Sequence, residues 1–195
     1  VKHYDNYDRK GSKVFAGEYA AHSKLTNDGE KKNNWESALA EAAFMTGLER
    51  NAGVVYMASY APLFAHIDAW QWAPDLIWFN SLQSYATPNY YVQQMYSTNK
   101  GTHVISMLHD GETIAGKNNV YGNAVIDKNK KEVIIKLANV NATSINYTIE
   151  LNGLKKINNK AVMQLLTSNN IADVNNFIQP QNIKPVEQTI AINNN

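Results

Sequence analysis

Glu18 is the side chain in this sequence that is best placed to do chemistry. It follows the short apolar run Val14–Ala16, whose small and β-favouring residues indicate a buried strand. A long polar stretch begins soon after it, so the carboxylate lies where the strand stops. In α/β folds such as the (β/α)8 barrel, strand ends carry the catalytic side chains. Desolvation of a carboxylate among apolar neighbours favours a functional role; pairing with a basic neighbour is the structural alternative.

Further strands and helices in the first half of the chain could hold this strand in place. Apolar residues at helical spacing predict a helix over 35–48, with Asn33 and Glu36 as a capping box. Val54–Ala58 predicts a second buried strand without polar alternation, as in a parallel sheet covered on both faces. After a long aromatic loop, Thr87-Pro88 predicts the start of another helix. Alternating strands and helices favour a parallel sheet in residues 1–101.

The second half, residues 102–195, has a different pattern. Short apolar runs are separated by Asn-rich turns, and Ile145–Leu151 alternates strictly between apolar and polar residues, which predicts a strand. We also expect strands within the following ranges: 102–109, 120–126, 132–137, 161–166 and 188–192. Many short strands separated by turn-forming residues favour an antiparallel β-sandwich.

The composition narrows the function classes. The chain has 195 residues, of which 44% are hydrophobic and 18% charged, and its net charge is +1. This balance gives no electrostatic case for binding nucleic acid or an anionic membrane. Cysteine is absent, which excludes thiolate catalysis and Cys-based metal sites. The sequence has no apolar run long enough to span a membrane and no apolar segment typical of a signal peptide. It also has no nucleotide-binding motif and no cluster of histidines and carboxylates at metal-ligand spacing, so we expect no cofactor and no metal.

Several long motifs, in order, resemble the C-terminal part of family 51 α-L-arabinofuranosidases. They are Val14–Ala20, Asn34–Asn51, Met57–Phe64, Trp72–Asn80 and Thr87–Gln93. The match is close over residues 1–100 and looser in the β half, through Asn139 and the 180–186 segment. The resemblance implies the last two βα units of a (β/α)8 barrel in residues 1–101, followed by a β-sandwich in residues 102–195.

The resemblance also implies a reaction. Family members are retaining glycosidases that remove terminal α-L-arabinofuranosyl groups from polysaccharides, and Glu18 matches their nucleophile. The family's acid/base follows an Asn at the end of another barrel strand, and this sequence has no Asn–Glu pair. Retaining hydrolysis needs both carboxyl groups. We therefore expect the chain to be a fragment of an arabinofuranosidase that is inactive alone. The sequence motifs do not indicate a cellular compartment, and a secreted or periplasmic parent protein is compatible with the resemblance.

For other residues near these strand ends, both a functional and a structural role are possible. Tyr19 and His22 could border the sugar pocket, or His22 could be a plain loop residue. Tyr60, at the end of the next strand, could contact substrate. Asp75 could bind a sugar hydroxyl or serve as the N-cap of a segment over 76–80. Trp72, with Trp70 and Trp78, could form a stacking platform or pack in the core. The histidines at positions 66, 103 and 109 have no partner at metal-ligand spacing.

The partner expected from the resemblance is an arabinofuranosyl-containing oligo- or polysaccharide. Trp35, Leu39, Phe44 and Leu48, together with the two apolar strands, would expose much apolar surface, which predicts a homo-oligomer that completes the half-barrel, or poorly ordered βα units. Two alternatives remain open. One is a non-catalytic carbohydrate-binding or assembly module, supported by the aromatic segment 63–96; the other is a degenerate pseudoenzyme.

Overall fold

The computed structural model describes residues 1–154 and 156–192. The βα region, residues 1–101, begins with strand β1 (Val14–Tyr19), helix α1 (Trp35–Arg50) and strand β2 (Val55–Tyr60). A one-turn 3-10 helix, Gly29–Lys31, interrupts the loop before α1. β1 and β2 pair in parallel, with Tyr19 opposite Tyr60, as the sequence predicts. Besides this pair, the described residues of the βα region hold a short mixed sheet and two α-helices, so the barrel itself stays a prediction.

Three short strands lie where the sequence analysis expected a long loop. They are β3 (Phe64–His66), β4 (Ile77–Phe79) and β5 (Ser84–Ala86), with β4 in the middle. That expectation was wrong because strands of three residues carry no periodic pattern. Trp78 on β4 is fully buried against Ala65 and Tyr85, and this packing fixes the small sheet.

Helix α2 (Pro88–Thr98) begins as predicted, with the Thr87 side chain accepting a hydrogen bond from Tyr90 N–H. Helix α1 begins one residue later than the predicted capping box. Its N-cap is Asn34, whose side chain accepts from Ser37 N–H. The Asn33 side chain turns instead to the ends of other segments, where it is bonded to Tyr60 and to the backbone of Asp75.

The β region, residues 102–192, contains a three-stranded antiparallel sheet and a separate antiparallel pair. The sheet has the order β10 (Glu132–Asn139), β9 (Val120–Asp127), β6 (His103–Ile105), and the pair consists of β11 (Lys160–Leu165) and β12 (Val186–Ala191). Minor elements are β7 (Leu108–His109), β8 (Glu112–Thr113) and the one-turn 3-10 helix Lys117–Asn119. These strands fit a β-sandwich, as expected.

The strand predicted over Ile145–Leu151 was wrong, because this segment is irregular. Ile145, Tyr147 and Ile149 alternate in sequence, yet each is at least one third exposed. Alternation predicts a strand only where a neighbouring strand supplies backbone hydrogen bonds, and none of the described residues forms a ladder with this segment.

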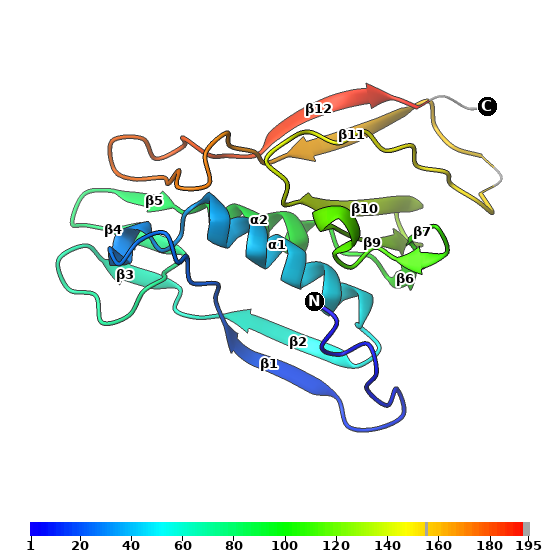
Figure 1. Cartoon of the computed structure of the whole chain (residues 1–195), viewed down its shortest axis with the longest axis horizontal. Helices are drawn as coiled ribbons and strands as arrows, with labels where there is room; N and C mark the ends of the chain where they lie inside the picture. Colours follow the sequence, from blue (N-terminus) through cyan, green and yellow to red (C-terminus); the bar gives the residue numbers. More distant parts are fainter. Residues whose placement is uncertain (155, 193–195) are drawn as a thin grey trace.

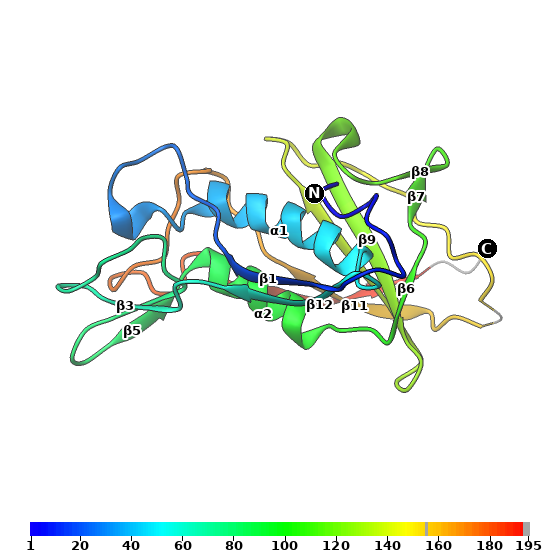
Figure 2. The same ribbon diagram turned by 90° about the horizontal axis from the view of Figure 1, so that it is seen from below.

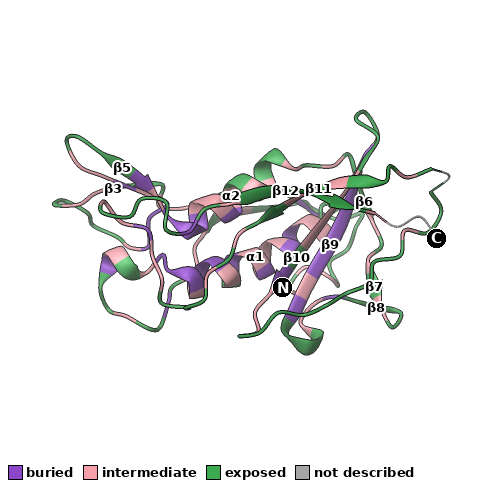
Figure 3. Ribbon diagram, turned by 90° about the horizontal axis from the view of Figure 1, so that it is seen from above, coloured by how far each residue is buried: buried purple, intermediate pink, exposed green. Residues whose placement is uncertain are grey.

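The helices form the middle layer of the structure. In Figure 1 the β1–β2 pair lies on one side of α1 and α2, while the sheets of the β region lie on the other. Figure 2, seen from below, shows β1 and β2 running alongside the two helices. The buried positions drawn in purple in Figure 3 concentrate on α1, the start of α2 and β9. Within the described residues, no helix has the length and apolar character that a membrane crossing requires.

A segment of the β region completes the core between the helices. Ile183 is buried with Trp35 and Ala38 of α1 and with Val92 of α2. The carbonyl groups of Ile171 and Asp173 accept hydrogen bonds from the first N–H groups of α1, at 2.9 Å each. The start of α1 therefore depends on residues far along the chain.

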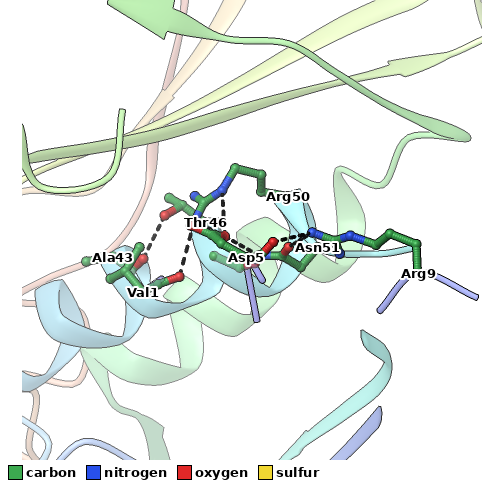
Figure 4. Close-up of polar contacts among 8 residues, drawn as sticks. Val1, Asp5, Arg9, Ala43, Thr46, Arg50 and Asn51 are labelled. Carbon is green, nitrogen blue, oxygen red and sulfur yellow. Dashed lines mark hydrogen bonds and ion pairs between the residues drawn. The ribbon is translucent and has the colours of Figure 1, made fainter. Parts of the chain in front are cut away.

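The N-terminal segment is tied to the other end of α1. Figure 4 shows Asp5 between Arg50 and Asn51. Arg50 Nη2 lies 2.8 Å from Asp5 Oδ1, and Asn51 donates to the same oxygen at 2.7 Å. Arg9 donates to Asn51 Oδ1 at 2.7 Å. These bonds hold the segment that precedes β1 against the C-terminal end of the helix.

Candidate active site

The C-terminal ends of β1 and β2 bring Glu18 and Tyr60 to the same edge of the parallel pair. Ser59 donates a hydrogen bond to the carbonyl of Gly17, which ties the two strand ends together. The Tyr19 and Tyr60 rings contact edge to face, with centroids 6.0 Å apart. The parallel pairing predicted from the sequence therefore brings the two strand ends together, with Tyr19 opposite Tyr60.

Glu18 itself is exposed. The expectation of a desolvated carboxylate among apolar neighbours was wrong, because Tyr19 packs towards the helices while Glu18 lies on the open surface of the strand. Exposure leaves the carboxylate accessible, and the described residues place no basic partner within ion-pair distance of it. The structural alternative, a strand-end Glu paired with a basic neighbour, is not supported.

Tyr19 is half-buried and its hydroxyl donates to Gln93 Oε1 on α2, at 2.6 Å. Burial is the main cause that raises its pKa, to about 12, and the nearby Glu41 carboxylate adds to the effect. Its ring packs on Phe44 of α1, at 5.3 Å between centroids. Tyr19 is therefore engaged with both helices on the side of the sheet that they cover.

Tyr60 is buried, and its hydroxyl accepts a hydrogen bond from Asn33 Nδ2 at 2.8 Å. Asn33 Oδ1 accepts from the backbone N–H of Asp75 at 2.7 Å. One amide thus joins the end of β2 to the loop before β4. Burial raises the pKa of Tyr60, with further contributions from the Glu41 and Asp75 carboxylates.

Asp75 is 2% exposed, and its Oδ2 has no hydrogen-bond partner among the described residues. Burial raises its pKa to about 6. The N-cap interpretation was wrong, because the residues after Asp75 form strand β4 rather than a helix. The other interpretation, a hydrogen bond to a sugar hydroxyl, stays a prediction, because Oδ2 has no protein partner but is buried.

The three tryptophans of the aromatic segment have different environments. Trp78 is fully buried and is a core residue, so a sugar-stacking role for it was wrong. Trp70 contacts Trp78 edge to face at 6.0 Å and lies against Gly29, where an added Cβ would be only 2.5 Å from its ring. Trp72 is 73% exposed and is free for stacking. His22, in the loop after β1, is exposed.

Sequence reasoning missed Glu41, a buried carboxylate behind the end of β1. It is 1% exposed and accepts hydrogen bonds from Ala21 N–H and Gln93 Nε2, at 3.0 Å each. Burial raises its pKa to about 7. A signal was available, since Glu41 follows Ala38 by three positions on the apolar stripe of α1, where a charged residue is out of place.

Two hollows lie near these strands. A cavity of about 250 Å³ is lined by Tyr19, Ala20, Ala21, Ala40, Glu41 and Phe44. An open groove of about 560 Å³ lies between β2 and the facing parts of α1 and α2. Glu18 lines neither hollow. In the described part of the chain, no three His, Asp or Glu side chains gather at distances that would hold a metal ion.

Comparison with known proteins places this arrangement in a family. Residues 17–195 match the family model described as the α-L-arabinofuranosidase C-terminal domain. The chain is 36% identical to α-L-arabinofuranosidase 2 of Arabidopsis thaliana over 190 residues, which are 96% of this chain and 27% of that protein. It is 53% identical over 102 residues to an extracellular exo-α-L-arabinofuranosidase of Streptomyces chartreusis, covering 52% of this chain and 11% of the relative.

Solved structures of α-L-arabinofuranosidases are also similar to this chain. An arabinose-bound family 51 α-L-arabinofuranosidase, MgGH51, superposes on 97% of this chain and 31% of its own, with a TM-score of 0.85 and 30% identity. The enzyme from Thermotoga petrophila shares the fold, with a TM-score of 0.74 and 15% identity over 93% of this chain and 39% of its own. The chain thus spans about a quarter of its Arabidopsis relative's length and about a third of MgGH51. The resemblance drawn from the sequence motifs is confirmed: the chain belongs to the family 51 α-L-arabinofuranosidases, of which it represents a C-terminal portion.

Proposed function

We propose that the chain is part of a retaining α-L-arabinofuranosidase and that Glu18 is the nucleophile of that enzyme. The observation that carries this proposal is the position of Glu18, an exposed and unpaired carboxylate at the C-terminal end of a parallel strand. Catalytic groups of (β/α)8 enzymes occupy this position. The substrate would be a terminal α-L-arabinofuranosyl group on an oligo- or polysaccharide, which is in keeping with the names of the relatives.

The reaction needs two carboxyl groups about 5 Å apart. A Glu18 carboxylate oxygen attacks the anomeric carbon, while an acid protonates the departing glycosidic oxygen. Water, deprotonated by the same acid/base group, then attacks the anomeric carbon and releases both arabinose and the Glu18 carboxylate. Glu41 is not suited to be this second group, because it lies behind the strand, bonded to Ala21 and Gln93.

Four residues are proposed to contact the sugar: Tyr19, Tyr60, Trp72 and Asp75. The exposed Trp72 ring offers a stacking surface. Asp75 Oδ2 lacks a protein partner but is buried, so it can meet a sugar hydroxyl only when the loop before β4 moves aside. Tyr60 ends the neighbouring strand, opposite Tyr19. A contact from Tyr19 would have to come from its ring, since its hydroxyl donates to Gln93.

Hydrolysis of an aryl α-L-arabinofuranoside tests the proposal. We expect no turnover by the 195-residue chain alone, because the sequence contains no Asn–Glu pair to supply the family's acid/base. General acid assistance contributes on the order of 10²–10⁴ in rate. A longer protein that combines this chain with such a pair should turn the substrate over. Robust turnover by the chain alone would contradict the assignment of the acid/base to another segment.

We also infer that this chain associates with itself. The β1–β2 pair exposes Phe15, Tyr56 and Met57, each by more than half of its surface. Trp35 and Leu48 do not contribute to this surface, because they are buried, contrary to expectation. Large exposed apolar side chains on a strand pair favour association. Light scattering should show a dimer or a larger species, and a compact monomer would contradict the inference.

A further inference from the structure

We propose that Glu41 is a positioning residue for Glu18, and that its buried carboxylate holds the end of β1 in the geometry that the nucleophile needs. The role assigned to Glu18 rests on the proposed function, whereas the contacts of Glu41 do not. Glu41 lies on α1, and the Phe44 ring of the same helix packs against Tyr19, the residue after Glu18.

Two contact paths run from Glu41 to the stretch of chain that directly follows Glu18. Its Oε1 accepts from the backbone N–H of Ala21, three residues beyond Glu18, at 3.0 Å. Its Oε2 accepts from Gln93 Nε2 at 3.0 Å, and Gln93 Oε1 accepts from the hydroxyl of Tyr19 at 2.6 Å. Both residues that are tied to Glu41 therefore lie within three positions of Glu18.

The surroundings of Glu41 make these bonds sensitive to its charge. The neighbouring groups are Tyr19 from β1, Tyr60 from β2, and the neutral amides of Asn89 and Gln93 from α2. None of them is a cation. Burial outweighs the hydrogen bonds to the carboxylate and raises its pKa to about 7.

Protonation would change the bonding at the strand end. A carboxylate accepts hydrogen bonds at both oxygens, whereas a carboxylic acid donates from one of them and accepts more weakly at the other. Loss of the charge therefore weakens the hold on Ala21 or forces the Gln93 amide to reorient. The end of β1 should then differ between the two charge states of Glu41.

Nuclear magnetic resonance of the 195-residue chain tests this coupling. The backbone amide resonances of Glu18, Tyr19 and Ala21 are followed between pH 5 and 9 in the unmodified protein. We expect all three to shift with one shared midpoint near 7, the pKa of Glu41. The Glu41→Gln variant keeps the shape of the side chain but cannot titrate, so it should lose this step.

Glu132→Gln is the matched control, because Glu132 is an exposed carboxylate at the start of β10. It should leave the step near pH 7 unchanged. The proposal is overturned if the unmodified chain shows no such step at Ala21 and Tyr19, or if the step persists in Glu41→Gln. Neither result depends on whether Glu18 is a nucleophile.

Activity provides a second readout, in a longer protein that turns over an aryl α-L-arabinofuranoside. Glu41→Gln should lower kcat roughly 10- to 100-fold with little change in KM, and should remove an inflection near pH 7 from the rate profile. An unchanged pH profile would contradict the positioning role. Full activity of a Glu18→Gln variant would instead refute the proposed function and leave the resonance result intact.

Discussion

The βα region and the β region differ in the hydrogen bonds that stabilise each of them internally. Most of the buried polar side chains lie in residues 1–101, among them Asn33, Glu41, Asp75 and Asn89. The β region relies more on backbone ladders, such as the eight residue pairs of β9 and β10. Buried polar side chains need specific partners at specific angles, so they fix strand ends and loops precisely. The difference indicates that the βα region is the part built for a site.

Substitutions in the two regions should differ most in their effect on turnover. In a longer protein with arabinofuranosidase activity, Glu18→Gln should reduce turnover by roughly 10⁴-fold or more, because the glycosyl–enzyme bond can no longer form. Rates are measured with an aryl α-L-arabinofuranoside. Glu112→Gln removes an exposed carboxylate from β8 in the β region and should leave the rate unchanged. Equal effects of the two changes would break the comparison.

Core packing provides the next test. Trp78→Ala should lower the free energy of unfolding by roughly 3–5 kcal/mol, because the fully buried ring leaves a cavity. Val162→Ala on β11 removes a side chain that is 65% exposed, and should change stability by less than about 0.5 kcal/mol. Urea denaturation measures both values. A small loss for Trp78→Ala would show that the β3–β4–β5 sheet contributes little to the folded state.

An ion pair between the two regions would show whether they fold as one unit. Glu49 on α1 lies 2.5 Å from Lys136 on β10, and both side chains are mostly buried. Burial lowers the pKa of Lys136 despite this partner. Lys136→Met should therefore cost roughly 3 kcal/mol by leaving Glu49 unpaired, and adding Glu49→Gln should restore much of the loss. Additive losses in the double variant, measured by urea denaturation, would contradict this account.

The titration of Glu41 gives a smaller and pH-dependent effect. Its folded-state pKa, about 7, lies above the ordinary value of 4.5, so the folded protein binds a proton that the unfolded chain releases. The associated stability is fully present below pH 4.5 and is lost as the pH rises through 7. The free energy of unfolding should fall across this range by at most about 3 kcal/mol relative to Glu41→Gln. Parallel pH curves for the two proteins would be inconsistent with this shift.

Local signals explain what could be predicted of the fold. Helix α1 combines an apolar stripe with a capping side chain and an end at Asn51, all of which lie within one segment. The choice of Asn34 over Asn33 as its cap depended on Tyr60 and Asp75, which are distant in sequence. Strands β3 to β5 were missed for the same reason, since each exists through its partners. The division between the regions at residue 101 stays a prediction.

In the candidate site, too, local signals could be predicted from the sequence and contacts between distant segments could not. The Glu18 motif and the parallel strands were readable, because they depend on a short run and on alternating elements. The exposure of Glu18 and the burial of Asp75 depend on how the loops fold back, which no spacing rule encodes. Glu41 was overlooked because its neighbours on the helix looked like an ordinary apolar face.

The amide of Asn33 has a consequence for how this edge tolerates change. It donates to Tyr60 from its nitrogen and accepts from Asp75 N–H at its oxygen, so both poles of one planar group are in use. Neither aspartate nor serine can reproduce this pairing, because a carboxylate has no donor and a hydroxyl does not reach in two directions at once. Substitutions at Tyr60 and in the loop before β4 will therefore be interdependent, and any variation here has to be tried in combination.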